Sequence, residues 1–124
     1  AVDSSGKVYV TDTWNQRVQV FVPDDTGLVY SASAEWLVEG WYGNGLENKP
    51  FITVDENGAV SVTDPEQCRV ITFSSDGRPL HVWDGCMETT AFQIPIGIVS
   101  DGSGGLWVTD AASGRLVHFK TQNP

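Results

Sequence analysis

Long apolar runs and basic charge are both scarce in this chain of 124 residues. The most apolar stretch, residues 94–99, contains a proline and a glycine and is far shorter than the roughly 20 residues of a membrane helix. Acidic residues outnumber basic ones 16 to 7, which leaves a formal charge of −9. A protein that grips phosphates needs clustered Lys and Arg. We therefore expect neither membrane insertion nor a nucleic-acid partner.

The first residues do not have the charge pattern of a signal peptide, because Asp3 stands where basic residues belong and no long apolar stretch follows. Since Ala1 rather than Met comes first, we expect a processed product or an excised piece of a longer chain. The composition is that of a folded protein, with 40% hydrophobic residues and five tryptophans. The length fits one domain, residues 1–124.

One unit occurs three times along the chain, at residues 2–21, 54–73 and 100–119. In each copy a leading Asp is followed by a Gly three residues later, an Asp nine residues later, and an Arg five residues beyond that second Asp. The repeat spacing is 52 and then 46 residues, because one loop is longer in the first copy. The leading residues are Asp3, Asp55 and Asp101, and the later pairs are Asp12 and Arg17, Asp64 and Arg69, and Asp110 and Arg115.

Each copy alternates apolar and polar residues with a period of two, which is typical of β-strands and not of helices. Glycines between the alternating stretches, such as Gly58 and Gly77, suit the positive φ of tight hairpin turns. No helical period persists anywhere. The pattern predicts about ten strands, at residues 7–11, 17–22, 35–39, 51–55, 59–63, 69–73, 80–83, 96–100, 105–109 and 115–120.

A four-stranded antiparallel unit that recurs every ~40 to 50 residues is typical of a β-propeller blade. The unit resembles the NHL repeat, whose motif is P-x-G-I-x-V-D-x-x-G-x-V-x-V-x-D-x-x-N-x-R-V-x-x-F. Residues 1–21 match it nearly whole, and residues 50–73 and 95–119 match it in large part. Gln67 and Ser113 depart from it, where the first copy has Asn15. The resemblance implies an all-β fold, a β-propeller of the NHL type with about three four-stranded antiparallel blades.

Three blades are fewer than the ~4 to 8 that close a propeller. The sequence also begins and ends inside a blade. We therefore expect a partial propeller that belongs to a longer one, or half of a six-bladed ring that a second copy completes as a homodimer. Either arrangement would cover open sheet edges that otherwise invite aggregation.

The repeated Asp and Arg residues allow two interpretations. The Asp residues could bind calcium, but an Arg follows each of them at the same spacing, which favours a structural pair across a turn. A residue that recurs in every repeat usually holds the repeat together. We interpret Asp12 with Arg17, Asp64 with Arg69, and Asp110 with Arg115 as structural pairs.

Cys68 and Cys86 are the only cysteines. A hairpin that turns at Asp76 and Gly77 places Cys68 opposite Gly85 or, with a three-residue turn, opposite Cys86. A disulfide fits that geometry, and buried or free thiols remain the alternative. A disulfide would indicate an oxidising compartment, so the expected localisation is extracytoplasmic. Two cysteines alone do not make a structural zinc site, which takes four ligands.

No catalytic residue, cofactor or metal is predicted. His81 and His118 are the only histidines, and both read as half-exposed strand residues. No G-x-S-x-G, Walker or H-x-E motif occurs. The alternative, implied by related six-bladed propellers, is a fragment of a metal-dependent lyase or lactonase. It would use carboxylates near the propeller axis, such as Asp55 and Asp101.

The expected function is non-enzymatic, as an interaction module for a protein, peptide or glycan ligand. NHL-like propellers commonly act in this way, and the turns between second and third strands share one propeller face with the connections between blades. That face receives the candidate ligand-binding residues, which are Trp14, Asn15, Trp41, Tyr42, Asn44 and Gln67. Trp and Tyr bury large areas at low entropic cost. Trp41 has a second interpretation, in which it fills the gap between two blades. A purely structural spacer is a further alternative function.

Overall fold

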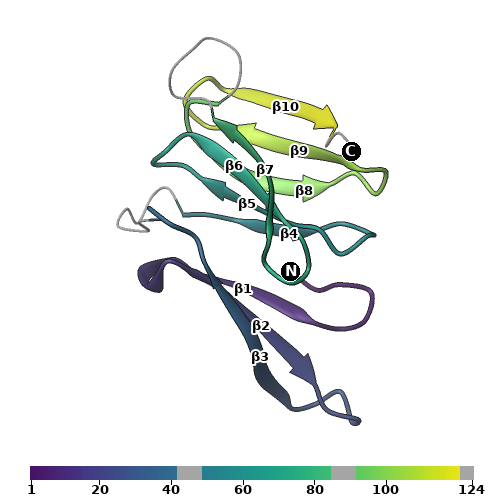
Figure 1. The fold of residues 1–124 in the computed structure, drawn as a ribbon. Coiled ribbons are helices and arrows are strands. Elements are labelled where there is room, and N and C mark those ends of the chain that lie inside the picture. The colour runs from purple at the N-terminus through teal and green to yellow at the C-terminus, as the bar shows by residue number, and fades with distance from the viewer. Residues whose placement is uncertain (42–48, 85–91, 121–124) are drawn as a thin grey trace.

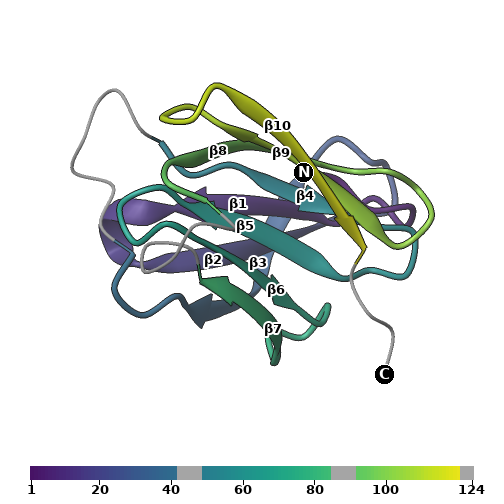
Figure 2. The ribbon, with the colours of Figure 1, turned by 90° about the horizontal axis from the view of Figure 1, so that it is seen from above.

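The computed structural model describes residues 1–41, 49–84 and 92–120. They form three antiparallel sheets, which lie one above another in Figure 1 and are here called blades 1, 2 and 3. Figure 2 shows the same stack from above, with the outermost strands of blades 1 and 2 on one side. No described helix has the length and apolar character to cross a bilayer.

The strands of each blade are consecutive in the chain and pair in sequence order. Blade 1 contains β1 (Val8–Asp12), β2 (Arg17–Pro23) and β3 (Tyr30–Leu37), with a short 3-10 helix, η1 (Thr13–Asn15), between the first two. Blade 2 contains β4 (Ile52–Val54), β5 (Val60–Asp64), β6 (Arg69–Phe73) and β7 (Pro79–Asp84). Blade 3 contains β8 (Pro95–Ser100), β9 (Gly105–Asp110) and β10 (Arg115–Lys120).

The all-β, partial-propeller prediction is confirmed, and each of the ten expected strands has a counterpart in the described residues. The third expected strand, 35–39, was wrong in its bounds, since β3 starts at Tyr30. Its first residues are small or exposed and show no alternation. The turn before it is closed by hydrogen bonds from Gly27 N–H to the Asp24 carbonyl and from Asp24 N–H to the Val29 carbonyl. The acidic pair that begins this loop therefore belongs to a tight hairpin turn.

Each blade has two faces, because side chains alternate across a strand. The rear face looks toward the preceding blade and the forward face toward the next. Between blades 1 and 2, the forward residues of blade 1 meet the rear residues of blade 2 in one buried cluster. Its members from these strands are Tyr9, Val18 and Val20, and Val60, Val62, Ile71 and Phe73.

A second cluster joins blades 2 and 3 in the same way. Val70 and Trp83 contribute the forward side, and Leu106 and Val108 contribute the rear side. Polar contacts link the same two blades, because the Thr63 hydroxyl donates to the Ile96 carbonyl at 2.8 Å and the Thr53 hydroxyl accepts from Ser100 N–H at 3.1 Å. The blades are thus packed face to face by apolar burial, the dominant favourable term in folding.

One extra residue in the third copy is absorbed by a bulge in β8. Ile98 pairs with Val108 as Ile52 pairs with Val62, but the register shifts between Pro95 and Ile98. A β-bulge accommodates one inserted residue without disturbing the rest of the ladder. The residues of β8 after the bulge therefore pair with β9 in the same register as β4 pairs with β5.

Candidate functional site

The turns that follow β1, β5 and β9 gather at one end of the stack, on the left in Figure 1. We call this the loop end. Its three turns are residues 12–17, 64–69 and 110–115, and residues 38–41 lie beside the first two. Val38 N–H donates to the Gln16 carbonyl at 2.8 Å, and the Gln67 side-chain amide donates to the Gly40 carbonyl.

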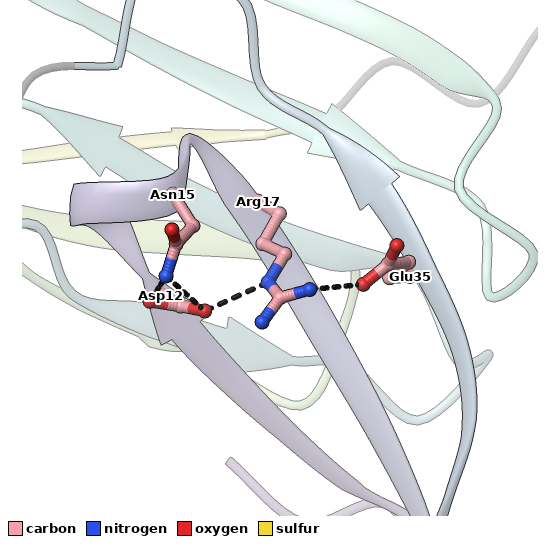
Figure 3. Close-up of polar contacts among 4 residues, drawn as sticks. All are labelled: Asp12, Asn15, Arg17 and Glu35. Atoms are coloured by element: carbon pink, nitrogen blue, oxygen red, sulfur yellow. Dashed lines mark hydrogen bonds and ion pairs between the residues drawn. The ribbon is translucent and has the colours of Figure 1, made fainter.

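The first turn is braced by the polar network in Figure 3. Asp12 accepts hydrogen bonds from the Asn15 side chain at 3.0 Å and from Arg17 Nε at 2.7 Å. The Arg17 guanidinium also contacts Glu35 of β3 at 2.5 Å. The hydrogen bond from Arg17, joined by that from Asn15, lowers the pKa of Asp12. Trp14 projects from this braced turn with 73% of its surface exposed.

The second turn holds its carboxylate inside the protein. Only 1% of the Asp64 side chain is exposed, and it contacts Arg69 Nε at 2.7 Å. Arg69 in turn donates to the Glu39 carbonyl at 2.5 Å, which ties this turn to the connection that leaves blade 1. Glu66 and Gln67 are exposed on the turn.

The third turn uses the same Asp for a different set of partners. The Asp110 carboxylate accepts hydrogen bonds from the backbone N–H groups of Gln93 and Ile94 at 3.1 and 2.9 Å. Arg115 lies farther away, at 3.6 Å, with half of its side chain exposed. Burial alone would raise the pKa of Asp110, but the N–H donors of Ile94 and Gln93 outweigh it, so its pKa is lowered. This carboxylate fixes the entry of the chain into β8.

One backbone feature recurs in all three turns. The residue directly before the Arg has a positive φ in each turn. The values are 52° at Gln16, 53° at Cys68 and 65° at Gly114. This left-handed conformation is ordinary for glycine and uncommon for other residues. The turn geometry therefore belongs to the repeat, and it holds the exposed side chains of the loop end in place.

The candidate ligand-binding residues do not share one environment. Trp14, Asn15 and Gln67 are exposed at the loop end. The prediction that Trp41 binds a ligand was wrong. Its side chain is 0% exposed, and its indole N–H donates to the Thr63 carbonyl at 3.1 Å. It lies in the cluster between blades 1 and 2, as the gap-filling interpretation requires. Tyr42 and Asn44 lie outside the described residues.

The predicted pairing of Cys68 with Cys86 also extends beyond what the structure describes. Cys68 is half-buried in the second turn, just before β6. None of the cysteines among the described residues is free. Cys86 lies outside those residues, so its pairing stays a prediction.

The leading Asp of each repeat lies at the opposite end of the stack and closes a turn. Asp55 accepts hydrogen bonds from the backbone N–H groups of Asn57 and Ala59 at 2.9 and 2.8 Å. Asp101 does the same for Ser103 and Gly105. The leading Asp therefore recurs in these repeats because its carboxylate closes a turn. The described residues contain no group of three His, Cys, Asp or Glu side chains arranged to hold a metal ion.

Sequence reasoning missed one contact at this end. His118 Nε2 lies 2.8 Å from the second carboxylate oxygen of Asp101, and the imidazole stacks on Trp107 at 4.1 Å between ring centroids. In blade 1 the matching oxygen, on Asp3, accepts from the Tyr9 hydroxyl at 3.1 Å. The recurrence of a leading Asp was the available signal. Its partner could not be identified, because it comes from β1 in blade 1 and from β10 in blade 3.

The Asp101 contacts give a pH dependence. The hydrogen bond from His118, then those from Gly105 and Ser103, hold the pKa of Asp101 far below its ordinary value of 3.8. A lowered pKa in the folded state stabilises the protein above the unfolded pKa, and this stability is lost as the pH falls below it. We expect the Tm to fall between about pH 5 and pH 2, and to fall less steeply in Asp101→Asn.

Circular dichroism melts across that pH range measure this effect. Asp25→Asn is the matched control, because Asp25 is exposed in the turn between β2 and β3. The Tm of Asp25→Asn should depend on pH as steeply as that of the unmodified chain. If the Tm of Asp101→Asn and the Tm of the unmodified chain fell equally steeply with pH, this carboxylate would have no role in acid unfolding.

Comparison with known proteins supports the blade assignment. Residues 1–21 match the family model described as the NHL repeat. A solved structure of selenomethionine-substituted virginiamycin B lyase from Staphylococcus aureus is similar, with a TM-score of 0.52 and 18% identity, over 100% of this chain and 41% of that one. A streptogramin B lyase structure has a TM-score of 0.46 and 15% identity, over 97% of this chain and 53% of that one. No curated protein matches the sequence.

These likenesses concern the fold alone, because the identities are low. The chain spans about half of the length of the solved structures that it resembles. The match to the NHL repeat and the three stacked sheets agree with each other, since both indicate propeller blades.

Proposed function

We propose that this chain is a binding module whose loop end recognises a protein, peptide or glycan ligand. The loop end belongs to three stacked blades of an NHL-like β-propeller. The observation that carries the proposal is the exposure of Trp14, 73% of its surface, on a turn braced by Asp12, Asn15 and Arg17. A large aromatic side chain on a rigid support loses little entropy on binding, and Trp is enriched among residues that dominate binding energy.

The repeat itself does not require a tryptophan at this position. The matching residues of the second and third turns are Glu66 and Ala112, and both are exposed. The same turn therefore forms with an acidic or a small residue. The turn does not need an indole for its structure, because the other two blades form it without one. The exposed indole of Trp14 therefore favours a role in recognition.

Two further exposed side chains at the loop end could hydrogen-bond a polar ligand. Gln67 is exposed, and its side-chain amide contacts the Gly40 carbonyl, so it is ordered beside the connection between blades 1 and 2. Asn15 is exposed and held by Asp12. Ordered amides suit a polar ligand, because they supply hydrogen bonds of fixed direction.

We expect Trp14→Ala to weaken binding at least about tenfold without destabilising the fold. Ligands are first selected from a glycan microarray and a displayed peptide library, and their affinities are then measured by calorimetry. Leu28→Ala is the control, because Leu28 is 83% exposed in the turn between β2 and β3, at the opposite end. Equal affinity of the Trp14→Ala and unmodified chains for every selected ligand would contradict the proposal.

The two cysteines favour an extracytoplasmic setting for this module, in which a bridge between Cys68 and Cys86 persists. Titration of thiols in the unfolded chain, without reductant, tests this part of the proposal. We expect no reactive thiol before reduction and two after it. Two reactive thiols before reduction would contradict the bridge and remove the argument for that setting.

The alternative is a fragment of a propeller lyase. The likeness to virginiamycin B lyase supports a shared fold, and its 18% identity supports no more than that. Incubation of the chain with virginiamycin B, followed by mass spectrometry, tests this alternative in one direction. The binding-module proposal expects the substrate to remain unchanged, and conversion would favour the enzyme.

A further inference from the structure

The loop end carries an excess of negative charge. Each Arg of its three turns lies within ion-pair distance of the Asp of its own turn, so these cations are already paired. Lys49, which precedes β4, is half-buried. Glu39 and Glu66 are exposed, and neither carboxylate forms an ion pair within the described part of the chain. The charge at this end agrees in sign with the formal charge of −9 for the whole chain.

Backbone contacts place these two carboxylates close to the turn that carries Trp14. Val38 N–H donates to the Gln16 carbonyl at 2.8 Å, so Glu39 directly follows a residue that is held against the first turn. The Glu39 carbonyl accepts a hydrogen bond at 2.5 Å from the Arg of the second turn. Glu39 therefore lies between the two turns, with Trp14 on one and Glu66 on the other.

The accessibility of this surface does not depend on a blade face that lacks a neighbour. Blade 2 lies between blades 1 and 3 (Figure 1), and Glu66, at the position that matches Trp14, is exposed there. The matching residue of blade 3, Ala112, is exposed as well. Exposure at this position is therefore a property of the turn.

We propose that the ligand of the loop end is a basic peptide segment, with one Lys or Arg side chain over the indole of Trp14 and a second beside Glu66. This inference rests on the binding function proposed above and narrows its ligand class. A cation is attracted to the negative π face of an aromatic ring, most strongly to that of Trp. The same carboxylates repel an acidic peptide or an anionic glycan, because like charges would face each other across the contact.

The spacing of the blades sets the spacing of the basic residues in the peptide. Stacked sheets lie ~10 Å apart, a distance that an extended peptide covers in about three residues. Trp14 and Glu66 occupy the same position in the turns of adjacent blades. Two basic residues about three positions apart therefore fit the two turns.

A displayed library of random-sequence peptides and a glycan microarray test this ligand class on the unmodified chain. Selected peptides should contain pairs of Lys or Arg residues at that spacing. When a selected peptide is synthesised with Gln in place of each Lys and Arg, its affinity should fall about tenfold. Raising NaCl from about 50 to about 500 mM should weaken binding of the basic peptide but not of its Gln counterpart, because salt screens exposed charges.

Two variants of the chain locate the contact. Glu66→Gln should weaken binding of the basic peptide about two- to fivefold. Asp25→Asn removes the same charge at the opposite end of the stack and should leave the affinity unchanged. Trp14→Leu keeps an apolar side chain but removes the π face, so it should reduce the difference in affinity between the basic peptide and its Gln counterpart.

The outcomes separate this inference from the binding function on which it rests. Selection of neutral or acidic peptides, or of glycans alone, would overturn the inference, and the binding function would stand if those ligands still required Trp14. Equal losses in Glu66→Gln and Asp25→Asn would also overturn it, because overall charge rather than the loop end would then attract the peptide. Screens that returned no ligand, or only ligands indifferent to Trp14→Ala, would contradict both.

Discussion

Replacing Asp64 by alanine should lower the free energy of unfolding by about 3 to 5 kcal/mol. The Asp64 side chain is 1% exposed and contacts Arg69, which is itself 19% exposed. Removing the carboxylate leaves a largely buried guanidinium without a counter-charge, with only the Glu39 carbonyl as acceptor, and also removes the acceptor of Gln67 N–H at 3.3 Å. Urea denaturation monitored by tryptophan fluorescence measures the loss.

Asp12→Ala supplies the matched control, because Asp12 occupies the same position of the first repeat. Its side chain is 23% exposed, and that of Arg17 is 32% exposed. This pair is therefore more accessible to water than the Asp64 pair, and because surface ion pairs contribute about 0 to 1 kcal/mol, a smaller loss of about 1 kcal/mol is expected. Equal losses in the two variants would show that burial does not set the contribution of these pairs.

Replacing Trp41 by alanine should cost a similar amount, about 3 to 5 kcal/mol. Trp41 is 0% exposed in the cluster between blades 1 and 2, so its removal leaves a cavity at that contact. The substitution also orphans the Thr63 carbonyl, which accepts the indole N–H. Trp41→Phe keeps most of the ring and should lose less, because it removes chiefly the hydrogen bond and part of the packing.

Thermal melts and urea titrations of the Trp41 variants measure this cost, with Trp14→Ala as the control. Trp14 is 73% exposed, so its removal should change stability by less than about 0.5 kcal/mol. The two tryptophans thus separate stability from recognition. If Trp41→Ala were as stable as Trp14→Ala, the packing of blades 1 and 2 described above would be incorrect.

The fold could be predicted because each repeat carries its own signals. Alternation at residues such as Val60 and Val62 predicts strands, and Gly58 predicts the turn before them. The same signals occur three times, so an error in one copy is corrected by the others. The start of β3 at Tyr30 was not predictable, because an outer strand exposed on both sides needs no alternation.

The contacts at the loop end were harder to predict from the sequence than the fold. The Asp and Arg spacing indicates a turn contact, but not that Asp110 turns toward Gln93 and Ile94, since that depends on how two distant segments meet. Burial of Trp41 depends on the same kind of contact between blades. Exposure of Trp14 is likewise a property of the packed stack. Short-range patterns report local structure, whereas these features are set by tertiary packing.

The most direct test of the binding account is an NMR titration of the ¹⁵N-labelled chain with a ligand selected in the screen. Ligand contact changes the amide chemical shifts of nearby residues, so the titration locates the binding surface. The account predicts that the largest changes fall on residues 12–17, 38–41 and 64–69, at the loop end. Largest changes at residues 3–7, 55–59 and 101–105, at the opposite end of the stack, would contradict it.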